Sequence, residues 1–109
     1  MLLRTIALSA VAALALTGFA RAETIKVGVT PGPHAQVLEA AKAVAAKKGL
    51  DIQIVEFSDY VVPNTALDTG DIQANSFQHQ PYLDNQVADR KFKIVAVGNT
   101  INFPMGIYS

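Results

Sequence analysis

The residues best suited to chemistry in this chain lie in one short segment. It combines aromatic rings, an imidazole and side-chain amides in the order Asn75-Ser76-Phe77-Gln78-His79-Gln80-Pro81-Tyr82-Leu83. Aromatic rings can wall an apolar ligand, whereas imidazole and amide groups orient a polar one, which is the usual division of labour in a pocket. The composition of this segment therefore points to ligand binding before it points to catalysis.

Metal binding and enzyme catalysis find less support. The two histidines, His34 and His79, are accompanied by no cysteine and by no clustered spacing of further ligands, and a metal site needs three or four. Neither Ser58 nor Ser76 lies in a Gly-x-Ser-x-Gly turn, and the prolines of Gly28–Pro33 remove amide donors that a phosphate would need. We expect no catalytic residue, no metal and no cofactor. An exported enzyme that uses His79 stays open as a further interpretation.

The first residues predict a cleaved export signal. Arg4 supplies a positive start, Ile6–Leu16 is an apolar run broken only by Ser9, and Ala20-Arg21-Ala22 presents small residues where a signal peptidase reads them. The run is shorter than the roughly 20 residues that cross a bilayer. We therefore expect residues 1–22 to be a signal peptide and the mature protein to reach the periplasm.

The composition of residues 23–109 limits their partners. All nine acidic residues of the chain lie here, but Arg4 and Arg21, two of the nine basic residues, do not, which leaves a formal charge of −2. Such a chain does not attract nucleic acid or an anionic membrane. The lack of cysteine excludes disulfides and removes the thiol that a bacterial lipoprotein needs at its processed N-terminus. Membrane association is expected only through a protein partner.

The elements that must position the opening segment alternate between strand and helix. Alternating β-branched residues predict strands at Thr24–Thr30 and Leu50–Phe57. Between them, helical spacing of apolar residues predicts a helix over Ala35–Lys48, which ends at Gly49. Two strands joined by a helix of this length form a βαβ unit with parallel pairing.

Shorter elements follow the second strand. The pattern predicts a short helix around Thr65–Asp68, a strand at Ile72–Asn75, a helix over Pro81–Arg90 and a strand at Lys93–Val97. The opening segment thus follows a strand's carboxyl end, the edge of a parallel sheet where ligands usually bind. Ile101–Tyr108 is apolar, but no later element covers it. We expect one domain at most, and a fragment of something longer.

The aromatic residues around this edge have two interpretations. Tyr60, Phe77 and Tyr82 lie near predicted strand ends, where aromatic residues are commonly part of the core. Three rings and His79 beside two strand-end loops instead favour the wall of a pocket. His79 by itself could as well cap the helix that begins near Pro81.

Several segments carry a more specific pattern. Residues 59–67 read Asp-Tyr-Val-Val-Pro-Asn-Thr-Ala-Leu, residues 70–84 contain Phe-Gln-His-Gln-Pro-Tyr-Leu, and residues 95–100 read Val-Ala-Val-Gly-Asn-Thr. With the opening strand at Lys26–Pro33, they closely resemble the methionine-binding lipoprotein (MetQ/NlpA) family of ABC-transporter substrate-binding proteins. The resemblance covers essentially all of residues 23–109.

The resemblance implies an incomplete α/β fold of the type II periplasmic-binding-protein kind, mostly its first lobe. Such a protein closes over L-methionine or a related amino acid and delivers it to an ABC permease in the inner membrane. In that family the residues matching Tyr60, Phe77, His79 and Tyr82 line the ligand cleft. A thioether suits this wall, because each sulfur–aromatic contact contributes roughly 0.3–1.5 kcal/mol.

Two departures from the family also shape the expectation. Family members are more than twice this long, and the Arg and Asn groups that hold the ligand's carboxylate and amine lie beyond the equivalent of Ser109. The lipid-attachment cysteine is missing as well, which suggests a soluble exported variant. The principal alternative is a truncated remnant that folds poorly and transports nothing.

Overall fold

The described residues form a parallel sheet with helices packed around it. The computed structural model describes residues 22–103 and 106–107. Within them, β1 (Glu23–Val29), β2 (Leu50–Glu56) and β3 (Ala74–Ser76) form one sheet in the order β2-β1-β3. Both pairings are parallel, so that Val27 of β1 lies opposite Ile54 on one side and Ala74 on the other. The predicted parallel α/β architecture is confirmed.

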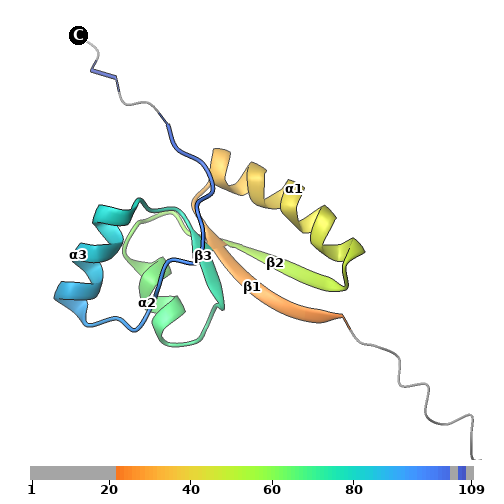
Figure 1. The fold of residues 1–109 in the computed structure, drawn as a ribbon, viewed down its shortest axis with the longest axis horizontal. Coiled ribbons are helices and arrows are strands. Elements are labelled where there is room, and N and C mark those ends of the chain that lie inside the picture. Colours follow the sequence, from red (N-terminus) through yellow and green to blue (C-terminus); the bar gives the residue numbers. More distant parts are fainter. Residues whose placement is uncertain (1–21, 104–105, 108–109) are drawn as a thin grey trace, which may run out of the picture.

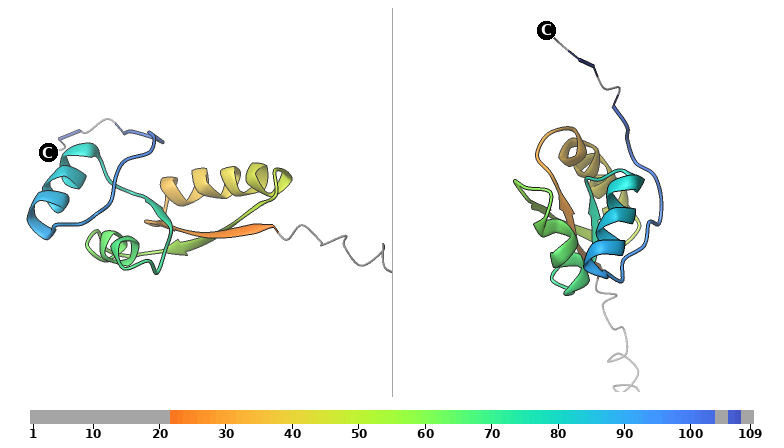
Figure 2. Two further views of the ribbon diagram at one scale, coloured as in Figure 1. Left: turned by 60° about the horizontal axis from the view of Figure 1, so that its bottom comes forward. Right: turned by 90° about the vertical axis from the view of Figure 1, so that its left-hand side faces the viewer.

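Three helices in the described part of the chain connect and flank these strands. They are α1 (Pro33–Lys47), α2 (Val62–Asp68) and α3 (Gln80–Arg90). Figures 1 and 2 show α1 lying over one face of the sheet, while α2 lies on the other side and α3 beyond the end of β3. Because the chain adds β2 on one side of β1 and β3 on the other, the strand order reverses at β1. In parallel sheets, a ligand crevice opens at such a reversal.

The core is thin and centres on β1. Its buried apolar side chains are Val27, Val29, Ala35, Ile52, Ala66, Ile72, Phe77, Leu83 and Phe92. Packing over the middle of β1 is close enough to require glycine. A Cβ added at Gly28 would lie 2.8 Å from side-chain atoms of both Ile72 and Phe57. The chain therefore has no room for any larger residue at this point without moving one of these side chains.

One predicted element is wrong. Lys93–Val97 has a strand-like sequence, but the structure assigns no strand to any described residue after α3. The backbone N–H of Lys93 donates to the Asp68 carboxylate (2.9 Å), and the side chains of Val95 and Val97 are 80% and 95% exposed. A β-branched run becomes a strand only when a neighbouring strand supplies hydrogen bonds. No backbone bond joins this segment to β3 in the described ranges.

The predicted signal peptide, residues 1–22, falls outside the described residues except for Ala22, so it stays a prediction. Residues 104, 105 and 108 of the apolar Ile101–Tyr108 segment also lie outside the described residues. Across residues 22–103 and 106–107, no helix is both long and apolar enough to cross a membrane.

Candidate functional site

Two loops at the carboxyl end of the sheet carry three of the four predicted site residues, and the fourth, Tyr82, lies in α3. One loop follows β2 and contains Tyr60, and the other follows β3 and contains Phe77 and His79. They leave the sheet at the same end because β2 and β3 both run parallel to β1. Phe57 extends the pairing by one residue, since its N–H donates to the Val29 carbonyl (2.8 Å). The sheet therefore brings together residues that lie far apart in the sequence.

The three predicted aromatic residues form one cluster, called the aromatic cluster below. The ring of Phe77 stacks on that of Tyr60, with centroids 6.2 Å apart and planes inclined by 21°. The ring of Phe77 also makes an edge contact with the ring of Tyr82, with centroids 6.1 Å apart and planes inclined by 76°. Both geometries belong to the favourable range for aromatic pairs, which contribute about 0.5–1.5 kcal/mol beyond their buried area.

Exposure differs sharply within the aromatic cluster. Phe77 is only 8% exposed, whereas Tyr60 is 63% exposed. The two sequence interpretations therefore apply to different residues. Phe77 is a core residue, and Tyr60 is a surface ring in offset, nearly parallel contact with it. A large exposed ring with a rigid apolar backing is well suited to contact a ligand.

Hydrogen bonds fix the loop that carries Tyr60. The hydroxyl of Tyr82 donates to the Tyr60 carbonyl at 2.6 Å. On the next turn of the chain, the Asp59 carboxylate accepts from the N–H groups of Val61 and Val62, both at 2.8 Å. This carboxylate satisfies donors at the start of α2, where the helix itself supplies no acceptor. The backbone on both sides of Tyr60 is therefore restrained.

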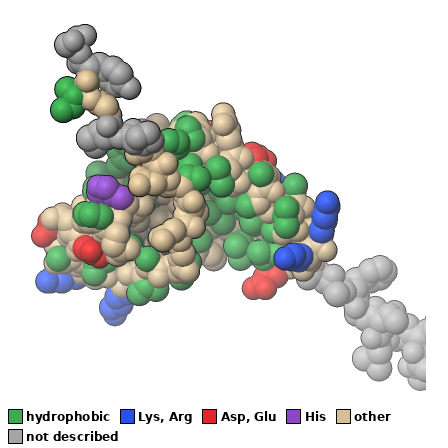
Figure 3. Space-filling view, turned by 45° about the horizontal axis from the view of Figure 1, so that its top comes forward, with side chains coloured by type: hydrophobic (Ala, Val, Ile, Leu, Met, Phe, Trp, Pro, Cys, Tyr) green, Lys and Arg blue, Asp and Glu red, His purple; other side chains and the backbone are tan. Residues whose placement is uncertain are grey.

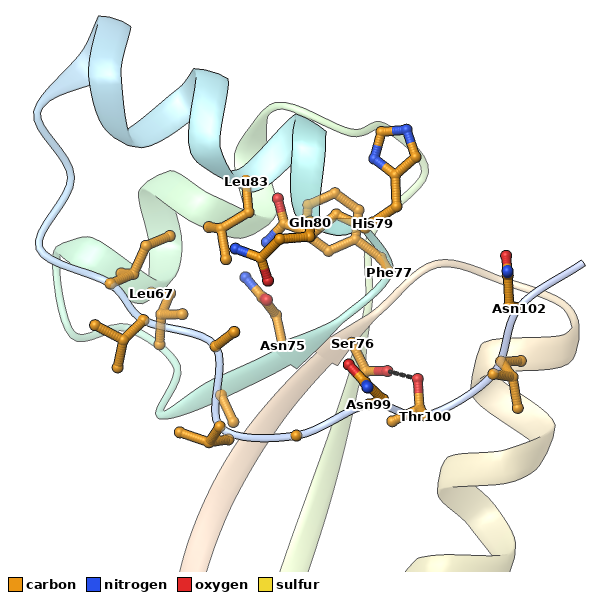
Figure 4. A pocket seen from close by; sticks show the side chains of 18 of the residues that line it. Leu67, Asn75, Ser76, Phe77, His79, Gln80, Leu83, Asn99, Thr100 and Asn102 are labelled. Atoms are coloured by element: carbon orange, nitrogen blue, oxygen red, sulfur yellow. Dashed lines mark hydrogen bonds between the residues drawn. The ribbon is translucent and has the colours of Figure 1, made fainter.

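His79 has a structural role that the sequence raised as an alternative. It is the N-cap of α3, and its Nδ1 accepts the N–H of Tyr82 at 3.1 Å. To accept this bond, Nδ1 must carry no proton, which leaves Nε2 as the ring's free polar atom. The capping alternative is confirmed. In Figure 4 the imidazole is turned away from Asn75 and Leu83 and toward the outside of the site.

The sequence analysis missed a group of amides beneath the loops. Asn64 of α2 and Gln78 exchange two hydrogen bonds, each at 2.8 Å. Asn75 of β3 donates to the same Asn64 oxygen (3.0 Å) and to the Pro63 carbonyl (3.1 Å). Asn64 is completely buried. The spacing of these residues in the sequence does not predict the contacts, because the partners come from α2, β3 and the following loop.

A groove of about 510 Å³ runs along the free edge of β3. Its walls are residues 73–80 on one side and residues 94–102 on the other, with Leu67 and Leu83 between them. Figure 4 shows the two sides joined by the hydrogen bond between Ser76 and Thr100 (3.2 Å). Phe77 and His79 line the groove, but Tyr60 and Tyr82 do not. The groove is the space between the unpaired edge of β3 and the segment that the sequence predicted as the next strand. Since it contains only two of the four predicted site residues, we place the candidate site at the aromatic cluster instead.

Charge and metal chemistry play little part in the described residues. No group of three or more potential metal ligands occurs among them. Figure 3 shows acidic and basic side chains scattered around the margins of one face, with apolar and uncharged side chains between them. The site therefore offers rings, amides and backbone groups to a ligand.

This geometry agrees with what is found among known proteins. Residues 25–109 match the model of the NlpA lipoprotein family, which is most of the chain. The chain belongs to the NlpA lipoprotein family. It is 53% identical over 104 residues to the D-methionine-binding lipoprotein MetQ of Escherichia coli strain K12, covering 91% of this chain and 38% of the relative.

Solved structures of this family share the fold. A crystal structure of the methionine-binding protein MetQ is 60% identical with a TM-score of 0.68, over 71% of this chain and 32% of that protein. A nutrient-binding protein from Burkholderia cenocepacia bound to methionine is 57% identical with a TM-score of 0.63, over 65% of this chain and 30% of that protein. The predicted family and the incomplete periplasmic-binding-protein fold are confirmed. This chain spans about a third of the length of these relatives.

Proposed function

We propose that this chain forms one wall of an amino-acid-binding cleft in a substrate-binding protein of an ABC importer. The observation that carries the proposal is Tyr60, a 63% exposed ring stacked on the buried ring of Phe77 at the carboxyl end of the sheet. Tyr82 and His79 complete the predicted site from the start of α3. The relatives described above are binding proteins, and we propose that this chain likewise catalyses no reaction.

Methionine is the ligand that this surface suits best. Its thioether side chain is apolar and polarizable, and it gains both from apolar burial and from sulfur–aromatic contact. The E. coli relative is named for D-methionine, whereas our expectation from sequence was L-methionine or a related amino acid. The side chain that meets the rings is the same in both enantiomers, so the aromatic cluster supports methionine without choosing between them.

We propose the periplasm as the location and an inner-membrane ABC permease as the protein partner. The apolar leader of residues 6–16 supports export. Lipoprotein relatives support a place at the cell envelope.

The proposal is tested by an NMR titration of residues 23–109 with L- and D-methionine. One aromatic wall supplies roughly 1–4 kcal/mol from partial burial and sulfur contact, so we expect a dissociation constant of about 1–100 mM. Shift changes should concentrate at residues 59–61 and 77–82. Alanine is the matched control ligand, because it keeps the zwitterion and lacks the thioether. Equal changes with both amino acids, or changes elsewhere, would contradict the proposal.

The same experiment separates the alternatives. A remnant that folds poorly should give a narrow, collapsed amide spectrum before any ligand is added. An enzyme that uses His79 should turn over an amino-acid derivative and lose that turnover on His79→Asn, which preserves the helix cap. No feature of the described residues favours this enzyme, because Nδ1 of His79 is already occupied by the cap.

A further inference from the structure

Beneath the two loops of the site lies a closed set of side-chain amides. Asn64 Nδ2 donates to Gln78 Oε1, and Gln78 Nε2 donates back to Asn64 Oδ1, both at 2.8 Å. Asn75 Nδ2 adds a second bond to Asn64 Oδ1 at 3.0 Å. Every polar atom of the Asn64 side chain therefore has a partner, although the residue is completely buried. These bonds restrain the Asn64 side chain, since rotation would leave its buried oxygen or nitrogen without a partner.

These amides join the two chain segments that carry the rings. Asn64 lies in α2, whose first turn directly follows the Tyr60 loop and is capped by Asp59. Gln78 is the immediate neighbour of Phe77, the ring on which Tyr60 stacks. Asn75 anchors the same pair to β3 and to the Pro63 carbonyl. The amide hydrogen bonds thus fix the distance between the two loops on the side of the sheet core. On the exposed side, the loops are joined only by the ring contact and by the bond from the Tyr82 hydroxyl.

We propose that Asn64 and Gln78 are positioning residues for the candidate site and that their amide pair holds Tyr60 in its nearly parallel contact with Phe77. The expected effect on methionine binding rests on the proposed function. The expected effect on the contact between the two rings does not. Two side-by-side hydrogen bonds set both the spacing and the rotation of the loops. Apolar side chains of the same size would fill the space without setting either.

The first test removes the hydrogen bonds and keeps the volume. In the Asn64→Leu/Gln78→Met double variant, both partners become apolar, and such paired replacements are close to neutral for stability. Asn75 keeps its bond to the Pro63 carbonyl and loses its bond to Asn64 Oδ1. We expect a small fall in the urea midpoint from the acceptor that Asn75 loses, weaker nuclear Overhauser contacts between the Tyr60 and Phe77 rings, and about three- to tenfold weaker methionine binding from the added cost of ordering the rings. Asn85→Leu, on the exposed face of α3, is the control.

The second test uses a single substitution and applies even if the double variant unfolds. Gln78→Glu keeps the shape, but its carboxylate cannot donate to Asn64 Oδ1 at about pH 7.5. At about pH 3.5 a glutamic acid with the usual pKa of about 4.3 is mostly protonated, and it can donate again. We expect the ring contacts to be weak at the higher pH and restored at the lower one. Wild type measured at each pH corrects for effects of pH that do not involve residue 78, and exposed Gln36→Glu controls for added charge.

The outcomes are distinct. Ring contacts and affinity equal to wild type in the double variant, or ring contacts of Gln78→Glu that do not change with pH beyond wild type, would overturn the inference. Failure of the wild type to bind methionine would overturn the proposed function alone, because the ring contacts are measured without ligand.

Discussion

Replacing Tyr60 by alanine should separate binding from folding. About a third of this residue is buried, against more than nine-tenths of Phe77. A fully buried aromatic side chain removes about 150–250 Å² from water, so a third of that is worth about 1–2 kcal/mol at 25 cal/mol per Å². This is an upper estimate, because a real unfolded chain already buries part of the area. Phe77→Ala should cost about 3–5 kcal/mol, since it also leaves a cavity.

Urea denaturation of residues 23–109, followed by far-UV circular dichroism, measures both losses when the variants share one m-value. We expect Tyr60→Ala to move the midpoint slightly and to abolish the methionine-dependent NMR shifts. Tyr60→Phe should keep the shifts, because it keeps the ring. A stability loss for Tyr60→Ala as large as that for Phe77→Ala, with the methionine response intact, would make Tyr60 an ordinary core residue and refute the reasoning.

Three further substitutions test how the site is held. His79→Ala should lower the free energy of unfolding by about 0.5–2 kcal/mol through loss of the α3 cap, while His79→Asn should largely retain it, both measured by urea denaturation. Tyr82→Phe removes the donor to the Tyr60 carbonyl and should cost about 0.5–1.5 kcal/mol with little change in the ring contacts of Phe77. Gly28→Ala should cost about 1–3 kcal/mol, because its Cβ meets Ile72 and Phe57 at 2.8 Å. Gly98→Ala is its control, since a Cβ there meets nothing within 4 Å, and equal midpoints for the two would contradict the packing argument.

Much of the fold could be predicted because it depends on local pattern. The two long strands and α1 were placed within a few residues, as was α3, whose sequence combines an early proline with a basic last turn. The strand expected at Lys93–Val97 failed for a non-local reason. Its β-branched residues are suited to a sheet, but pairing depends on a neighbour that residue pattern alone cannot supply.

Helix faces were also harder to predict than helix bounds. Val37 and Val44 have the spacing of a buried stripe on α1, yet they are 41% and 55% exposed, and the buried residue of this helix is Ala35. An alanine-rich helix has a weak apolar face, so the direction in which it packs depends on the sheet beneath it.

The amino-acid sequence by itself determined the family and the parallel α/β class and predicted the candidate site residues, because hydrophobic period, turn residues and a specific motif are local properties of the chain. Only the tertiary structure decided what each site residue does. It made Phe77 the buried backing, Tyr60 the exposed ring and His79 a helix cap, and it joined Asn64 to Gln78. The His79 cap is a local contact with Tyr82, three residues away. The pairing of Asn64 with Gln78 and the bond from Tyr82 to the Tyr60 carbonyl join residues 14 and 22 apart, and such contacts exist only once the strands have paired.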